Sequence, residues 1–351
     1  MKDRLVTLND SIHWVPEHVG HRRFGNWLES ARDWAVSRNR YWGSCLPIWQ
    51  CENGHEICIG SISELELASG VRLTDLHKHF VDPVTFPCPE CSEIMRRVPE
   101  VLDGWFESGS MPYGQLHYPF ENRARFEETF PARFIAEGLD QTRGWFYTLH
   151  VLAGALFDKP AFRNCVVNGI VLGSDGRKMS KSLGNYPDPE ELLDQTGADA
   201  LRAFLINSPV LRAEPFRFTN DGVRDVVRTV LLPLWNTYSF FTTYAEADGI
   251  TLPDLDAAAP PTERPEIDRW ILSVLQSLIE DVTRQMEGYY LFNVVPPVLG
   301  FVDHLTNWYV RRSRDRFWAG DEDAIDTLHT VLEVTCRVAA PLLPLTTERI
   351  W

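Results

Sequence analysis

The residues best suited to chemistry form one short stretch, Lys178-Met-Ser-Lys-Ser182. An apolar run rich in β-branched residues, Cys165 to Leu172, precedes it, and the turn Gly173-Ser-Asp-Gly176 separates the two. We predict a buried strand that ends in a loop presenting two ammonium and two hydroxyl groups. Such a loop suits a polyphosphate, because charge that closes on phosphates can stabilise a transition state more than a ground state. The side chains expected to act are those of Lys178, Ser180, Lys181 and Ser182.

A solvated loop of lysines and serines is the alternative, so the elements around it decide its meaning. Residues 134–136 form a short apolar strand, a nearly continuous apolar helix is expected over 145–157, and the strand over 165–172 follows. Strand, helix and parallel strand make a right-handed crossover unit, whose ligands bind at the carboxyl ends of the strands. Glu137, Asp140 and Gln141 fall at that edge with the lysines. The two carboxylates could also cap a helix, a role compatible with ligand binding.

Cysteine and histidine spacing predicts a metal site between residues 51 and 91. Cys88-Pro-Glu-Cys91 is a knuckle, and Cys51 with His55 supplies a second pair. Two such pairs a few tens of residues apart hold tetrahedral Zn²⁺ in small ribbons. Cys58 is an alternative to His55, and a knuckle without metal is the other possibility. Four protein ligands leave no open position, so the role would be structural.

The last third of the chain is helical in pattern. Apolar residues recur at spacings of three and four over 267–286, 298–309 and 325–339, which predicts an antiparallel bundle. A segment rich in proline, alanine and aspartate, 249–265, links it to a preceding helix over 226–244. Within the bundle there is a cluster of arginines and aromatic residues, which can bind phosphates and stack on unpaired RNA bases. Alternatively, these arginines form ion pairs on a solvated helix face. The residues are Trp308, Arg311, Arg312, Arg314 and Arg316.

Composition limits the classes of partner. The 351 residues carry a formal net charge of −15, so any RNA must be met by local basic patches. There is no apolar run of membrane-spanning length and no leader pattern, which predicts a soluble, cytoplasmic protein without a membrane partner. Seven cysteines, an odd number, fit reduced thiols and metal ligation better than a disulfide framework.

Several long strings together resemble the isoleucyl branch of the class I aminoacyl-tRNA synthetases, and the resemblance covers essentially the whole chain. The lysine stretch matches the second signature of that class. The matching strings are Ser37 to Trp49, Val101 to Tyr113, Glu137 to Tyr147, Gly176 to Pro189 and Asn307 to Trp318.

The resemblance implies a fold and its boundaries. Residues 1–50 would return the chain into the catalytic domain, and 51–100 would be a zinc-ribbon-like insertion. Residues 101–216 would be the second half of a Rossmann-like α/β catalytic domain, and 217–351 a truncated, all-α anticodon-binding domain.

The resemblance also implies an activity: an isoleucine–tRNA ligase that activates L-isoleucine with ATP and Mg²⁺ and transfers it to tRNA(Ile). Lys181 would contact the ATP phosphates, assisted by Lys178. Glu137, Gly138, Asp140 and Gln141 would contact the isoleucyl-adenylate. Trp105 and Trp145 would wall the isoleucine pocket.

The sequence departs from the family in extent. The sequence lacks the first half of the nucleotide fold and the editing insertion. Such enzymes need editing because one methylene group distinguishes isoleucine from valine by only about 1–3 kcal/mol. His18-Val-Gly-His21 resembles the other class signature, but we predict neither a strand nor a turn rich in proline and glycine before it, and therefore not the function of that signature. We therefore expect the isolated chain to be inactive without the missing N-terminal half. The alternatives are a non-catalytic tRNA-binding module or inactive fragment, and an incomplete gene model.

Overall fold

The computed structural model describes residues 1–247, 249 and 259–351. Most of the predicted linker over 249–265 therefore lies outside the described residues. The chain divides into two compact units. Unit 1 comprises Met1–Ile135 and Asp140–Cys165, and unit 2 comprises Ala136–Leu139 and Val166–Trp351. No described helix has both the length and the apolar character needed to cross a membrane.

The strands around the predicted crossover form a small sheet. Its order is β1-β9-β8, so the predicted neighbours β8 and β9 do lie side by side. The helix predicted over 145–157 is confirmed as α8 (Trp145–Leu156). In unit 1, α1 packs on α8, where Gly154 leaves room for the Leu5 side chain. The remaining elements named here are α1 (Lys2–Asn9), β1 (His13–Val15), β8 (Ile135–Gly138) and β9 (Asn164–Asn168). The expectation that no strand precedes His18 is wrong, because β1 ends three residues before it and pairs with β9, a partner distant in sequence.

The predicted single strand over 165–172 is wrong. The structure has two strands, β9 and β10 (Val171–Leu172), and β10 pairs in parallel with β11 (Phe216–Arg217) in a separate sheet. The break falls at Gly169, whose amide donates to the Val210 carbonyl at 2.6 Å. A Cβ at Gly169 would lie 1.9 Å from the Glu214 carbonyl oxygen. The close passage of another backbone segment therefore redirects the chain here, and apolar character alone could not reveal it.

The predicted metal ligands lie in the loops beside the strands of a small antiparallel sheet within unit 1, whose order is β4-β3-β6-β5. Trp49 and Met95 are buried in its core, and the Trp49 indole donates to the Val84 carbonyl at 2.9 Å. An antiparallel pair, β2 (Ser37–Arg38) with β7 (Val101–Leu102), flanks the insertion. The elements are β3 (Ile48–Gln50), β4 (Glu56–Cys58), α3 (Ile62–Ser69), α4 (Lys78–Val81), β5 (Phe86–Pro87) and β6 (Ile94–Arg97).

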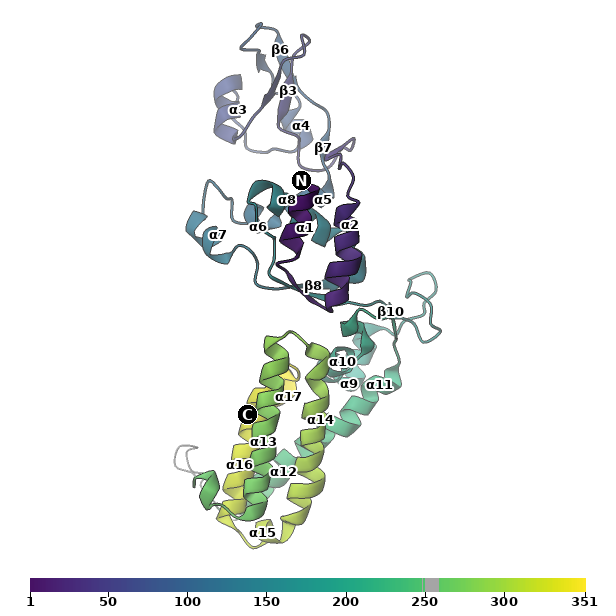
Figure 1. Ribbon diagram of the computed structural model, residues 1–351, viewed down its shortest axis with the longest axis vertical. Helices are drawn as coiled ribbons and strands as arrows, with labels where there is room; N and C mark the ends of the chain where they lie inside the picture. Colours follow the sequence, from purple (N-terminus) through teal and green to yellow (C-terminus); the bar gives the residue numbers. More distant parts are fainter. Residues whose placement is uncertain (248, 250–258) are drawn as a thin grey trace. The chain divides into compact units, whose positions relative to one another are not determined.

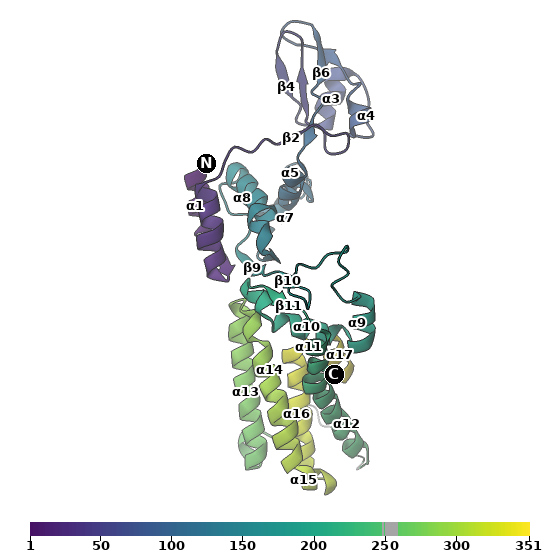
Figure 2. The ribbon, with the colours of Figure 1, turned by 90° about the vertical axis from the view of Figure 1, so that its right-hand side faces the viewer.

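Unit 2 ends in a helical bundle, as predicted. The long helices α12, α13, α14 and α16 run side by side in both views (Figures 1 and 2). Their apolar stripes meet in one buried cluster that includes Phe301, Leu328 and Tyr309. The bundle elements are α12 (Leu232–Ala247), α13 (Glu266–Glu287), α14 (Val295–Asp303) with its continuation η8 (His304–Val310), α15 (Arg314–Trp318), α16 (Glu322–Ala339) and α17 (Pro344–Ile350).

Shorter helices complete the described parts of both units. In unit 1 they are α2 (Gly25–Glu29), α5 (Gly104–Gly109), α6 (Met111–Gly114) and α7 (Arg123–Thr129). In unit 2 they are α9 (Pro189–Thr196), α10 (Ala198–Ile206) and α11 (Asn220–Val226).

Candidate functional site

The lysine loop, defined here as residues 178–182, follows β10 through a tight turn in unit 2. Leu172 and Lys178 form an isolated antiparallel bridge, and the Gly173 amide donates to the Arg177 carbonyl at 2.9 Å. Gly176 closes this turn with a φ of +78°, a left-handed conformation that glycine adopts at little cost. The chain reverses within a few residues, so Lys178 lies beside the end of the strand.

Both lysines of the loop are exposed. Across the part of the chain that the structure describes, neither Lys178 nor Lys181 has a carboxylate partner. Met179, between them, packs against a buried cluster that includes Leu192 and Phe218. The apolar anchor thus faces inward while the two ammonium groups face solvent, which leaves both charges available to an anion.

The two serines of the loop hold its backbone as well as offering hydroxyls. The Ser180 hydroxyl accepts from the Leu183 amide at 3.2 Å and lies 3.1 Å from the Ser182 hydroxyl. Lys181 therefore sits at the tip of a turn closed from Ser180 to Leu183.

The predicted adenylate contacts are divided between the two units. Glu137 is exposed and Gly138 half-buried at the end of β8 in unit 2. Asp140 and Gln141 lie in a 3₁₀ turn, Leu139–Arg143, and the Gln141 amide donates to Asp140 at 3.0 Å in unit 1.

The two predicted pocket residues lie on adjoining helices of unit 1. Trp105 is in the first turn of α5, and Trp145 begins α8, which packs on α5. The Trp145 indole donates to the Ser108 carbonyl at 3.1 Å, while 46% of Trp105 is exposed. Gly144 lies between them, since a Cβ there would fall 3.0 Å from the Trp105 ring. The contact explains why a residue without a side chain stands at this position.

A capping aspartate fixes the first of these tryptophans. Asp103 accepts from the Trp105 amide at 3.2 Å and from the Trp34 indole at 2.9 Å. Arg38 adds a charged bond of 2.7 Å to the same carboxylate. The buried Asp103 thus orients α5 through three partners, and the Ser37 string contributes one of them.

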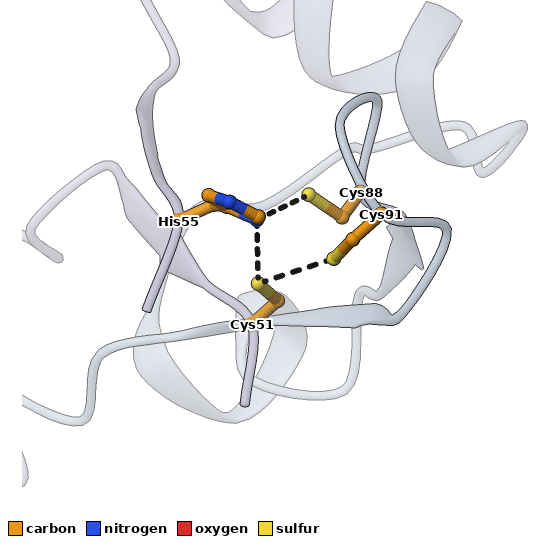
Figure 3. Close-up of side chains that lie close together, drawn as sticks. All are labelled: Cys51, His55, Cys88 and Cys91. Atoms are coloured by element: carbon orange, nitrogen blue, oxygen red, sulfur yellow. Dashed lines mark hydrogen bonds between the residues drawn. The ribbon is translucent and has the colours of Figure 1, made fainter. Parts of the chain in front are cut away.

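The four predicted metal ligands gather in one place (Figure 3). All their ligand atoms lie within 4.8 Å of one another. The His55 Nδ1 is 3.5 Å from the sulfurs of Cys51 and Cys88, and the Cys51 and Cys91 sulfurs are 3.7 Å apart. Tetrahedral Zn²⁺ with Zn–S near 2.3 Å requires edges of about 3.5–3.8 Å. The donor set and its spacing therefore fit Zn²⁺.

The surroundings of this cluster favour ligation through His55 rather than Cys58. Cys58 is exposed on β4 and lies outside the cluster. The other ring nitrogen of His55, Nε2, is 3.4 Å from Glu90, a contact that would orient the ring of a ligating histidine. A hydrogen bond from the Asn53 side chain, the largest influence, lowers the pKa of Cys91 to about 6.

The arginines of the bundle differ in what they contact. Arg311, Arg312 and Arg314 are exposed, and the Arg312 guanidinium lies 4.5 Å from the centre of the Trp308 ring. Trp308 is 48% exposed, so a cation and an aromatic face lie together at the surface. Such a pair can contact a phosphate and stack on an unpaired base.

Arg316 is held differently. It makes bonds of 2.7 and 2.8 Å to Asp268, a wholly buried carboxylate, and one of 2.8 Å to Asp321. The ion-pair alternative considered for the whole cluster therefore describes Arg316. The geometry gives it a structural role within the bundle.

Sequence reasoning did not single out Asn185. Its side chain contacts Asp175, Lys178 and Ser180 and so touches both the turn and the lysine loop. An asparagine after a Gly is an ordinary turn residue, and no spacing rule could have distinguished it.

Comparison with known proteins assigns the catalytic part and the helical bundle of the chain to two family models. Residues 1–217 match the family model described as tRNA synthetases class I (I, L, M and V). Residues 268–351 match the anticodon-binding domain of tRNA ligase. The whole chain is 53% identical to an isoleucine–tRNA ligase of Treponema denticola and 54% identical to one of Mycobacterium tuberculosis. It spans about a third of the length of these curated relatives, 33% in each case.

Solved structures show the same fold at lower identity. The LeuRS–tRNA–LeuAMS ternary complex of Agrobacterium radiobacter superposes with a TM-score of 0.68 at 22% identity, over 91% of this chain and 40% of that one. Methionyl-tRNA synthetase of Mycobacterium tuberculosis bound by methionyl-adenylate gives 0.69 at 17% identity, over 99% of this chain and 60% of that one.

Proposed function

Because this chain belongs to the class I tRNA synthetases, we propose that it forms part of an isoleucine–tRNA ligase. The observation that carries the proposal is the identity of 53–54% with isoleucine–tRNA ligases along the whole chain. The chain spans about a third of those relatives, so the complete activity is proposed for the protein that contains it.

The proposed reaction has two steps. The carboxylate of L-isoleucine attacks the α-phosphorus of ATP, and pyrophosphate leaves with the displaced electron pair. A hydroxyl of the terminal ribose of tRNA(Ile) then attacks the carbonyl of the adenylate, and AMP leaves. Both steps need charge neutralisation and alignment more than a covalent protein intermediate.

The lysine loop would serve the first step. Lys178 and Lys181 lack carboxylate partners in the described parts of the chain, so their charge can neutralise the leaving pyrophosphate. Ser180 and Ser182 would add hydroxyl contacts to the phosphates. Mg²⁺ would enter with ATP and offset part of its charge.

The adenylate and the amino acid would be met by the residues at β8 and α8. Glu137, Gly138, Asp140 and Gln141 would contact the adenylate. Trp105 and Trp145 would wall an apolar site for isoleucine, which offers no polar group on its side chain and must be selected by shape. Zn²⁺ held by Cys51, His55, Cys88 and Cys91 would stabilise the insertion only.

The exposed arginines would meet tRNA(Ile). Arg311, Arg312 and Arg314 with Trp308 combine charge and an aromatic face, which suits an unpaired RNA loop. Arg316 is left out of the proposed RNA surface, because two carboxylates already bind it.

The test replaces the matching segment of the Treponema denticola relative with this chain and measures isoleucine-dependent pyrophosphate exchange. We expect activity in the chimera, and a fall in kcat of roughly 10²-fold for Lys181→Ala with little change in the KM for isoleucine. Lys159→Ala, which also removes an exposed lysine, is the matched control. An inactive chimera would count against the proposed function. An active chimera indifferent to Lys181→Ala would reject the role of that lysine.

A further inference from the structure

We propose that Asn185 is a positioning residue whose side chain locks the lysine loop to the turn before it. The consequence for catalysis rests on the proposed function, but the lock itself is a property of this chain. The contacts that carry the proposal all lie within residues 172–185 of unit 2.

The turn before the loop has a carboxylate at its centre. Asp175 accepts from the Arg177 amide at 2.9 Å, and this bond is the largest of the influences that lower the pKa of Asp175. The Gly176 amide donates to the Gly173 carbonyl at 2.9 Å and completes the turn. The ionised Asp175 carboxylate is therefore held next to Asn185, where the chain returns from the lysine loop.

The Asn185 side chain joins that turn to the loop. Its carbonyl oxygen accepts from the Ser180 amide at 3.0 Å. Its NH₂ group donates to the Lys178 carbonyl and to Asp175, each at 3.3 Å. One amide group thus bonds to the backbone on both sides of Met179 and to the preceding turn.

The close approach also shapes the residues nearby. A Cβ at Gly173 would lie 2.5 Å from the backbone carbonyl oxygen of Asn185 and 2.9 Å from its side-chain nitrogen. Gly184, with a φ of +56°, turns the chain so that Asn185 faces back towards residue 173. Two glycines therefore make room for the contact and direct it.

Only an amide satisfies this arrangement. Aspartate could accept from Ser180 but would place a second carboxylate beside Asp175, and alanine would make none of the bonds. Since Lys178 and Lys181 have no carboxylate partner among the described residues, ion pairs do not hold the loop. The Asn185 bonds therefore hold the backbone that carries the two charges, while leaving the charges free.

Cleavage by a lysine-specific endoprotease measures this lock directly in the chain as it is. The chain has five lysines, of which Lys178 and Lys181 lie in the loop and Lys78 in unit 1 provides an internal reference. The cleavage rate is proportional to the population of the opened loop when the loop opens and closes faster than the protease cleaves. We expect Asn185→Ala to raise the rate at Lys178 and Lys181 roughly tenfold, with no change at Lys78.

Two further variants separate the lock from a general loss of stability. Asn293→Ala, which removes one side-chain bond of 3.0 Å to Gln285 elsewhere in unit 2, should leave loop cleavage unchanged. Asn185→Asp should open the loop further, and adding Asp175→Asn should restore part of the protection, because a donor again faces a carboxylate. Equal cleavage of wild type and Asn185→Ala, or no recovery in the double variant, would overturn the proposal.

In the chimera, Asn185→Ala should lower the kcat of pyrophosphate exchange roughly tenfold and change the KM for isoleucine less than twofold. A protease-sensitive variant with full exchange activity would overturn the positioning role while leaving the proposed function intact. An inactive wild-type chimera would count against the proposed function, and the protease result would still decide whether the lock exists.

Discussion

The Arg316 guanidinium lies 2.7 Å from the Asp268 carboxylate and ties α15 to α13 inside the helical bundle. The Tyr309 hydroxyl donates to the same carboxylate at 2.8 Å. Asp321 accepts from Arg316 and also caps α16 through the Ala324 amide at 3.1 Å. The hydrogen bond to Asp268, followed by that to Asp321, raises the pKa of Arg316 above its usual value. One arginine thereby connects three helices.

We expect Arg316→Met to destabilise the bundle by about 3 kcal/mol, because it leaves the buried charge of Asp268 without its partner. Denaturant unfolding followed by far-UV circular dichroism would measure the loss. Arg314→Met, which removes an exposed arginine from the same helix, is the control and should change stability by less than about 0.5 kcal/mol. Adding Asp268→Asn to Arg316→Met should recover part of the loss. Equal unfolding curves for the two arginine variants would contradict the structural role.

A buried histidine should make unit 1 sensitive to acid. His150 is fully buried, and its Nε2–H donates to the Leu5 carbonyl at 2.8 Å, whereas its Nδ1 has no hydrogen-bond partner among the residues that the structure describes. Burial lowers the pKa of His150 below its usual value of about 6.5. Between the lowered and the usual pKa, the unfolded chain binds a proton that the folded chain does not. The contribution to stability is therefore complete above the unfolded pKa and is lost as the pH falls below it.

His150→Gln can keep a donor to Leu5 but cannot titrate. Thermal unfolding between pH 7.5 and 5.5 should show a shallower loss of stability for this variant than for wild type. A single group cannot contribute more than about 1.4 kcal/mol per pH unit. Parallel pH profiles of wild type and variant would show that His150 does not titrate on unfolding.

The cysteine and histidine cluster predicts a stoichiometric metal. Purified protein should contain about one Zn²⁺ per chain, and Cys88→Ser should abolish it. Cys58→Ser is the matched control, because that thiol is exposed and lies outside the cluster. Metal analysis, with thermal unfolding before and after chelation, would measure both effects. Retention of zinc by Cys88→Ser, or its loss from Cys58→Ser, would show that the ligands are others.

Two glycines should respond oppositely to alanine. Gly169→Ala should cost several kcal/mol, because the added carbon would overlap the Glu214 backbone at 1.9 Å. Gly300 lies within α14, where no described atom outside the neighbouring helix backbone lies within 4 Å of an added Cβ. Gly300→Ala should therefore stabilise the bundle by about 0.5–1 kcal/mol. Denaturant unfolding of both variants tests the pair, and a tolerated Gly169→Ala would contradict the close approach.

Much of the chemistry was fixed by residue type and local spacing. The pattern of cysteines and histidine predicted the four side chains that gather in one cluster, the apolar periodicity predicted the bundle helices, and the spacing of Lys178 and Lys181 predicted a cationic loop. These features depend on residues close in sequence, and the side-chain periods of helices and the geometry of short metal knuckles are local rules.

Contacts between distant residues were decided only by the tertiary structure. The break of the predicted strand at Gly169 depends on the backbone at Val210 and Glu214. The presence of His55 rather than Cys58 in the cluster depends on which side chain the hairpin turns towards Cys88 and Cys91. Arg316 looks like the neighbouring arginines in sequence, yet among the arginines of this cluster it is the one that bonds to Asp268, 48 residues away, within the described parts of the chain. Local propensity does not contain such long-range partners, because they exist only once separate segments have packed together.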